Sequence, residues 1–294
     1  MKAKKQILAS QIALKRSQNN ETELQNALAR YFKIIEDAVL RNLDEYWSDN
    51  ILLKGQVDLI LQPITDAEDA YYQILEQYIK REYQLGIAEA KRLVTLANER
   101  QSHKAVFRRK FIQGVRTIAN RFNLFGTLDD AETELLQRTK IFSKRTLARI
   151  TSDINQILTT GYTDGKGINV VASTITKRFT ELETWEAKRI ARTEIHNAHN
   201  NAVMKTYETL GVEYTQWIAA DDDRTRDSHL EVDREIIPMG GTYSNGLGYP
   251  GDTTGPIEEW INCRCSNAPF VMPYGMMAPP GMEQFREEDL IPIK

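Results

Sequence analysis

Cysteine is nearly absent from this sequence: Cys263 and Cys265 are the only two cysteines among 294 residues. Two cysteines cannot build the disulfide framework of a small secreted domain, and their spacing excludes a redox C-x-x-C pair. A bond between them is also disfavoured, because residues i and i+2 of an extended segment carry parallel Cβ vectors. The sequence therefore indicates a protein made in a reducing compartment.

Long apolar runs are missing as well. No segment approaches the roughly 20 consecutive apolar residues that span a bilayer. The basic start, residues 1–5, is followed by neither the apolar core nor the cleavage site of a signal peptide. Hydrophobic residues make up 41% and charged residues 27% of the chain, which predicts a globular protein without a membrane partner.

The signatures of several enzyme classes are absent too. The sequence contains no glycine-rich phosphate loop, no EF-hand spacing and no G-x-S-x-G motif. His196 and His199 stand three apart on a predicted helix, whereas a zincin helix needs a spacing of four with a glutamate directly after the first histidine. We interpret them as polar groups, solvated or hydrogen-bonded, on an interfacial helix. No catalytic set is visible, so the chain is not expected to be an enzyme.

The aspartates at residues 221–223 form a short acidic run. They suit a divalent cation, but they lack the spacing of a known calcium or phosphoryl-transfer site. We expect them to cap the following turn and to pair with a nearby arginine, namely Arg224, Arg226 or Arg264.

One segment lacks acidic residues altogether. Residues 103–125 contain six basic side chains and no carboxylate, with apolar residues at helical spacing among them. Basic groups on an apolar-backed helix neutralise phosphates without reading bases, which predicts contact with DNA or with an acidic protein. The residues expected to make this contact are Lys104, Arg108, Arg109, Lys110, Arg116 and Arg121. The chain from Tyr207 onward has six basic and sixteen acidic residues, so the two regions are expected to meet different partners.

Helical periodicity runs through the first two thirds of the chain. A stripe at three-and-four spacing joins Leu24 to Tyr46, and Ser143 and Thr184 are expected to cap later helices. From residue 212 the pattern changes to short extended segments around a glycine-rich loop, and the extended segments are expected at residues 212–219 and 257–271. We predict an α+β fold that is predominantly α, with a helical region at 1–164, a loop-rich module at 165–272 and a Pro, Gly and Met-rich tail at 273–294.

The two cysteines can be interpreted in two ways. If residues 263–265 are extended, both sulfurs project from one face and Arg264 from the other. Two thiolates are half of a tetrahedral structural zinc site, for which His229 is the natural third ligand. The fourth ligand would be a carboxylate, namely Asp221, Asp233 or Asp252. Alternatively, both thiols are small buried hydrophobes on a core strand.

Five short motifs occur in order toward the end of the chain. They are Ala191-Arg192-Thr193-Glu194, Gly211-Val212 with Trp217, Asp223-Arg224-Thr225-Arg226 with His229, Pro250-Gly251-Asp252, and Asn262-Cys263-Arg264-Cys265. Over residues 140–272 this order resembles the Mu F-like head morphogenesis family, the minor head proteins of tailed bacteriophages. The resemblance implies structural roles for the motif residues, namely Arg192, Glu194, Trp217, Asp223, Arg224, Arg226, His229, Asn262, Cys263 and Cys265.

The resemblance also implies a function. Family members are low-copy proteins inside the phage head, associated with the portal, and some bind DNA and influence its delivery into the host. For this chain it implies a virion protein near the portal vertex, present in the host cytoplasm during assembly. The expected partners are the portal protein, double-stranded DNA bound without sequence specificity, and further copies of the chain or scaffold and capsid protein. The helical region at 1–164 is expected to make the contacts with the portal protein and with DNA. Some relatives carry a toxin domain, which is not expected here.

Two other functions stay open at this point. The first is a metal-dependent hydrolase or nuclease that uses His229, Cys263 and Cys265. The second is a purely structural portal adaptor that does not touch DNA.

Overall fold

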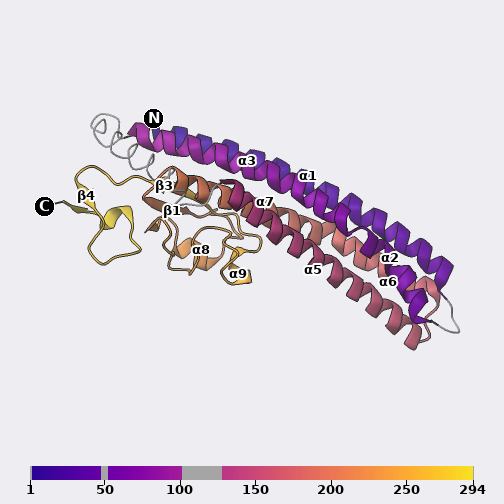
Figure 1. Cartoon of the computed structure of the whole chain (residues 1–294). Coiled ribbons are helices and arrows are strands. Elements are labelled where there is room, and N and C mark those ends of the chain that lie inside the picture. The colour runs from indigo at the N-terminus through magenta and orange to yellow at the C-terminus, as the bar shows by residue number, and fades with distance from the viewer. Residues whose placement is uncertain (1, 48–51, 101–127, 294) are drawn as a thin grey trace. The chain divides into compact units, whose positions relative to one another are not determined.

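The protein is predominantly helical. The computed structural model describes residues 2–47, 52–100 and 128–293, whose helices and strands are drawn in Figure 1. A π-helical turn, η1 (Leu182–Glu186), joins two of the helices without a break. The long helices are α1 (Lys2–Tyr46), α2 (Lys54–Asp66), α3 (Glu68–Arg100), α5 (Leu128–Thr163), α6 (Ile168–Glu181) and α7 (Ala187–Thr209).

Short elements follow α7. They are β1 (Tyr214–Ile218), α8 (Asp227–Glu231), β2 (Ile236–Pro238), α9 (Ile257–Trp260), β3 (Ser266–Phe270), β4 (Met276–Met277), the 3₁₀ turn η2 (Glu287–Asp289) and β5 (Ile291–Pro292). The predicted α+β fold, predominantly α, is confirmed. Among the helices of the described ranges, none combines the length and the apolar character that crossing a membrane requires.

The chain divides into two compact units, each built from separate stretches of sequence. The helical unit comprises Asn20–Ile79 and Glu134–Ala191. The sheet unit comprises Met1–Asn19, Lys80–Thr133 and Arg192–Lys294. The region boundaries expected after residues 164 and 272 follow changes in sequence character and stay a prediction.

The core of the helical unit contains the predicted stripe of α1. Leu24, Leu28, Val39 and Leu43 are at most 1% exposed, as their spacing on one helical face requires. The aromatic rings of this unit also pack together: the Tyr31 ring centroid lies 5.3 Å from that of Tyr71. The periodicity of the sequence therefore identified this buried face correctly.

Two predicted helix starts are wrong. Ser143 lies in the middle of α5, where its Oγ donates to the Lys140 carbonyl at 2.8 Å. Thr184 lies inside η1, and its Oγ1 donates to the Thr180 carbonyl at 2.7 Å. Hydroxyl side chains suit both a helix cap and a bond to the preceding turn, so residue type alone did not distinguish the two.

The π-helical turn carries Glu186 into the core of the helical unit. Its carboxylate is 2% exposed and lies 2.5 Å from Arg149 Nη2 and 2.6 Å from Arg178 Nη1. Arg178 also contacts Asp153 at 2.9 Å. Burial alone would raise the pKa of Glu186, but the hydrogen bonds from both arginines outweigh it and lower that pKa. The turn thus places one buried anion between two cations.

We predict that Glu186→Gln lowers the free energy of unfolding by about 1.5–3 kcal/mol, because two charge-assisted hydrogen bonds lose their anion. Urea denaturation followed by circular dichroism measures the change. The matched control is Glu181→Gln, which alters a longer contact of 3.5 Å to the same Arg178 from a carboxylate that is 43% exposed. The control should change stability by less than about 1 kcal/mol, and equal effects of the two substitutions would contradict this account.

The sheet unit is organised around β1. This strand pairs antiparallel with β2 on one side and β3 on the other, with Thr215 opposite Ile237 and Pro269. The predicted strand at 212–219 is therefore confirmed. The prediction of an extended chain over 257–271 is half wrong, because residues 257–260 form α9 and only 266–270 form β3.

The tail, residues 273–293, adds a second small sheet in which β4 pairs with β5. Phe285 is 2% exposed and anchors the tail, since it forms a bridge with Ile236 and packs edge-on against Tyr214. Arg286 donates to the Glu231 carbonyl at 2.6 Å. A segment without sequence periodicity is thus held to the sheet unit by a few specific contacts.

Candidate functional site

The sheet unit brings together the three residues predicted to bind zinc. His229 lies on α8, while Cys263 and Cys265 lie in the irregular segment between α9 and β3. His229 Nδ1 is 3.4 Å from Cys265 Sγ and 3.8 Å from Cys263 Sγ. All three donor atoms lie within 4.8 Å of one another, and each residue is at most 2% exposed. We call these three residues the His-Cys-Cys cluster.

The other ring nitrogen of His229 faces a carboxylate. Nε2 lies 3.0 Å from Glu259 Oε2, and the Ser228 hydroxyl donates to the same oxygen at 2.9 Å. The imidazole packs edge-on against Trp217, with ring centroids 5.1 Å apart. These contacts fix the orientation of the ring with Nδ1 toward the sulfurs. The sequence pattern did not predict the contact between Glu259 and His229, because the segment that carries Glu259 was expected to be extended.

The two thiols share one proton. A hydrogen bond from Cys263 is the main cause that lowers the pKa of Cys265 to about 5. Burial opposes this shift, and a hydrogen bond to His229 contributes to it. The same hydrogen bond and burial raise the pKa of Cys263 well above its usual range. The thiolate form is therefore favoured at Cys265 over Cys263.

No predicted fourth ligand joins the cluster. Asp252 accepts hydrogen bonds from Gly248 N and Thr254 N within its own loop, each at 3.0 Å. Asp233 Oδ1 accepts from Ala219 N at 2.9 Å. Within the described ranges, the donor group around His229 has three members, and Asp221 is not among them. The expectation of a carboxylate ligand is therefore wrong for this conformation.

The acidic run at 221–223 is a turn rather than a metal site. Asp222 Oδ1 accepts hydrogen bonds from Arg224 N at 3.0 Å and from the Thr225 hydroxyl at 3.1 Å. Arg264 Nη2 lies 2.5 Å from the same oxygen. Arg264 therefore pairs with the acidic run, as predicted. Asp223 is 91% exposed.

Other motif residues hold the Cys segment in place. Arg226 is the N-cap residue of α8 and donates from Nη2 to the Ile261 carbonyl at 2.6 Å. Asn262 adopts a left-handed conformation with φ of 55°, which asparagine tolerates better than most residues. Its backbone N donates to Thr193 Oγ1 on α7 at 3.2 Å. Arg192 and Glu194 flank Thr193 on this helix, and Glu194 is 1% exposed.

Helix α7 also supports the neighbouring loop through Asn200. Its Nδ2 donates to the Pro250 carbonyl at 2.9 Å and to the Cys265 carbonyl at 3.2 Å. The next residue, Gly251, has φ of 85°, and a Cβ there would lie 2.8 Å from Asn197 Oδ1. The Pro-Gly-Asp motif therefore needs glycine both for its backbone angle and for its close approach to α7.

Gly251→Ala should destabilise the sheet unit by about 1–3 kcal/mol from the backbone angle, with a further cost from the close contact. Gly246→Ala is the matched control, since Gly246 has φ of 83° and open space around its Cβ position. Thermal denaturation of both variants measures the difference. We expect Gly251→Ala to destabilise the protein more than Gly246→Ala does. Equal losses of stability would contradict the close approach of Gly251 to Asn197.

His196 and His199 form no metal site in the described part of the molecule. His196 contacts Asn200 Nδ2 at 2.9 Å, and burial is the largest cause that lowers its pKa to about 3. His199 lies between two carboxylates, with Nδ1 2.8 Å from Glu82 and Nε2 3.1 Å from Glu89. Both are partly buried polar groups with hydrogen-bonding partners, which agrees with the hydrogen-bonded alternative interpreted from the sequence.

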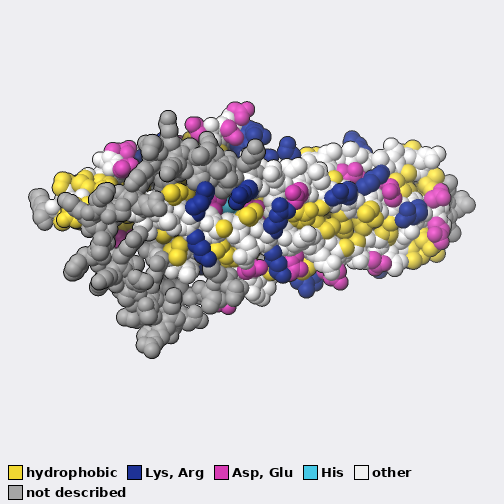
Figure 2. Space-filling view, turned by 90° about the horizontal axis from the view of Figure 1, so that it is seen from above, with side chains coloured by type: hydrophobic (Ala, Val, Ile, Leu, Met, Phe, Trp, Pro, Cys, Tyr) yellow, Lys and Arg dark blue, Asp and Glu magenta, His cyan; other side chains and the backbone are white. Residues whose placement is uncertain are grey.

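The predicted DNA-binding residues, Lys104, Arg108, Arg109, Lys110, Arg116 and Arg121, lie outside the described residues. Figure 2 shows one face of the molecule, on which Lys and Arg side chains lie singly among acidic and hydrophobic ones along the helices. That face therefore shows no further basic patch that would suggest another DNA-binding surface. The DNA contact stays a prediction.

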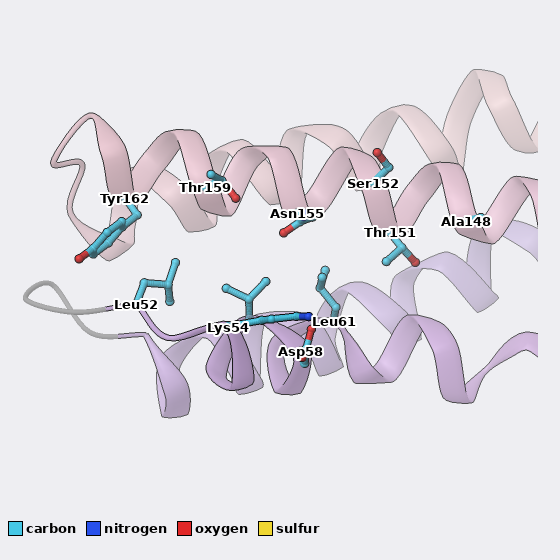
Figure 3. Close-up of a pocket in the computed structure, with 11 residues that line it drawn as sticks. Leu52, Lys54, Asp58, Leu61, Ala148, Thr151, Ser152, Asn155, Thr159 and Tyr162 are labelled. Atoms are coloured by element: carbon cyan, nitrogen blue, oxygen red, sulfur yellow. The ribbon is translucent and has the colours of Figure 1, made fainter.

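A pocket lies in the helical unit between α2 and α5 (Figure 3). Its volume is about 650 Å³, and its lining includes Leu61, Asn155 and Tyr162. Lys54 and Asp58 are the charged residues in this lining. None of the site residues predicted from the sequence lines this pocket.

Comparison with known proteins agrees with the motif pattern. Residues 152–268 match the family described as Phage Mu protein F like protein. The chain is 29% identical over 138 residues to the minor head protein GP7 of Bacillus phage SPP1. The match covers 45% of this chain and 44% of GP7, so the chain spans less than half of that relative. No solved structure matches the chain. The resemblance predicted from the five motifs is confirmed over this region.

Proposed function

We propose, from the premise that residues 152–268 are a Mu F-like module, that this chain is a minor head protein of a tailed bacteriophage and acts in head morphogenesis. The observation that carries the proposal is the family match over this module, together with a relative that is named a minor head protein. In this proposal the protein lies inside the head near the portal vertex, and it is incorporated there while the head assembles in the host cytoplasm.

The sheet unit supports a structural role for this module. The His-Cys-Cys cluster is at most 2% exposed, so a substrate has no access to it. In the neighbouring acidic run, Asp222 accepts hydrogen bonds from the backbone of its own turn and from Arg264, rather than binding a second metal ion. A hydrolase is therefore the weaker proposal. DNA cleavage by the purified protein with divalent metals, abolished by His229→Ala, would replace our proposal with the enzymatic one.

The helical region at 1–164 is expected from the resemblance to contact the portal protein, and we propose the tail as an additional portal-binding surface. Five large apolar side chains between residues 274 and 293 are at least 37% exposed, namely Tyr274, Met277, Met282, Ile291 and Ile293. Several large exposed apolar side chains in one segment make it a candidate for an interaction surface. The tail is anchored through Phe285, so it presents these groups from an ordered base.

The portal contact is tested by the affinity of the purified protein for the portal protein of the same genome. Tyr274→Ser with Met282→Ser should weaken binding at least about tenfold, a change of about 1.4 kcal/mol. The control is Ile141→Ser with Val170→Ser, two side chains on α5 and α6 that are 53% and 52% exposed. If both pairs have the same effect, the tail is not the portal surface.

We further propose that residues 104–122 contact double-stranded DNA through phosphates. The support is the six basic residues without a single acid between residues 103 and 125. Each phosphate contact contributes about 0.9 to the slope of log K against log salt concentration. Arg108→Glu with Arg109→Glu should therefore lower that slope by about 2.

The matched control for the DNA experiment is Lys144→Glu with Arg145→Glu. These are also adjacent basic residues, they are exposed on α5, and their reversal changes the net charge equally. Measured by filter retention at several salt concentrations, the control should keep its slope. If the Arg108 and Arg109 variant keeps the wild-type slope, the protein is a structural portal adaptor without DNA contact at these residues.

A further inference from the structure

We propose that His229, Cys263 and Cys265 bind one Zn²⁺ through Nδ1 and the two sulfurs, as a structural site that cross-links α8 to the segment before β3. The inference is independent of the head-protein function, since it rests on the geometry of the sheet unit. Its rival is that the two thiols only fill space in the core.

The distances suit a tetrahedral ion. With Zn–S of about 2.3 Å and Zn–N of about 2.0–2.1 Å, a sulfur and a nitrogen on one tetrahedron lie about 3.5 Å apart. The two observed separations between His229 Nδ1 and the sulfurs are 3.4 and 3.8 Å. The ion therefore fits between the three donor atoms with only small movements of the side chains.

The surroundings of His229 provide the second support. A zinc-bound histidine typically donates its other ring N–H to a carboxylate, which fixes the ring and its tautomer. Here Glu259 Oε2 lies 3.0 Å from Nε2, and Ser228 donates to the same oxygen at 2.9 Å. A carboxylate in this position favours the tautomer with its proton on Nε2, which leaves the Nδ1 lone pair free to bind a metal.

The charge and softness of the donors select the metal. Two thiolates and one neutral imidazole are a soft donor set, which suits zinc and not magnesium or calcium. Two thiolate charges also balance those of Zn²⁺, so the buried group becomes neutral, and a neutral group is far less costly to bury than an isolated charge. The described residues supply three of the four ligands of a tetrahedral ion.

The expected effect of the ion is to fix a loop-rich region. Between α8 and the cysteines lies a segment with six glycines from residue 238 to 256 and little regular structure. A metal ion that joins the two ends of such a segment closes a long loop. Because the site forms only in the folded protein, the free energy of metal binding adds to the free energy of unfolding. The cluster shares its core with Trp217 and Tyr243, so the ion also joins the loop to the sheet.

The experiment begins with wild-type protein purified without chelator. Its metal content is measured by elemental analysis, and a competing chelator of known affinity then gives the dissociation constant for Zn²⁺. We expect about one equivalent of zinc, as for structural sites of this kind. Replacement by Co²⁺ should give the sulfur-to-metal charge-transfer bands of a tetrahedral site, which cannot arise from packing alone.

Variants test the assignment of the ligands. Cys263→Ser with Cys265→Ser should abolish the cobalt spectrum. Glu259→Gln should weaken zinc binding about 10–100-fold while it retains the ligands. The matched control is Glu258→Gln on the same short helix, an exposed carboxylate that should not change the affinity.

Two results would overturn the proposal. One is a folded wild-type protein that contains no zinc and gives no cobalt spectrum on titration. The other is a double cysteine variant that binds the metal as tightly as the wild type. Because the affinity of the wild type is measured directly, a variant that fails to fold does not remove the test.

Discussion

Replacing Trp217 by alanine should lower the free energy of unfolding of the sheet unit by about 3–5 kcal/mol. Trp217 is fully buried on the central strand β1, where it meets Tyr243 and His229 with ring centroids 5.1 Å away in each case. The substitution removes a large apolar side chain and leaves a cavity at the point where the sheet, α8 and the Cys segment meet. Urea denaturation followed by circular dichroism measures the change in the free energy of unfolding.

Trp185→Ala provides the control for that substitution. Trp185 is 50% exposed, and its main neighbour is the Arg189 guanidinium, 4.7 Å from the ring centroid. We expect this control to change stability by less than about 1 kcal/mol. If Trp217→Ala is as mild, Trp217 is not the centre of the core, and the orientation of His229 would need another explanation.

Raising the pH from 6.5 to 10 should remove about 3–5 kcal/mol of stability that depends on His199, at about 1.4 kcal/mol for each unit of pKa shift. Burial alone would lower the pKa of His199, but the contacts with Glu82 and Glu89 outweigh it and raise that pKa to about 10. The raised pKa means that the folded protein holds this proton more tightly than the unfolded chain. The contribution is therefore complete below pH 6.5, and it is lost as the pH rises through 10.

The measurement is the difference in unfolding free energy between wild type and His199→Gln at several pH values. A difference is needed because the thiols of Cys263 and Cys265 titrate in this range in the unfolded chain, and they do so in both proteins. His196 does not interfere, because its pKa is lowered to about 3 and its effect is confined to pH below 6.5. The difference should shrink steadily from pH 6.5 to 10, and a constant difference would show that His199 carries no extra proton.

The sequence predicted the structure correctly where a pattern of residues is compatible with a single structure. The stripe on α1 has a single helical period, and its residues from Leu24 to Leu43 are buried as expected. His229, Cys263 and Cys265 were grouped by residue type alone, and the structure places their donor atoms within 4.8 Å. Soft donors are rare in this chain, so few other groupings were available.

The sequence was less informative where several structures satisfy the same residues. Ser143 and Thr184 have the side chains of helix caps, but both bond to the preceding turn of a continuous helix. The acidic run could pair with any of three arginines. In the fold it contacts Arg224 and Arg264, and the shortest contact joins Asp222 to Arg264. Glu259 was missed because its role depends on a contact with a residue 30 positions away. The contacts of Asp222 and Glu259 depend on distant segments, which a local sequence pattern does not specify.

The most direct test of the head-protein function is to count this protein in phage heads. Heads assembled from the capsid, scaffold and portal proteins of the same genome are purified with and without the portal, and the chain is quantified by mass spectrometry. Our account predicts a few copies in each head that contains a portal, and none in heads that lack one. Absence from portal-containing heads, or the same number without the portal, would contradict it.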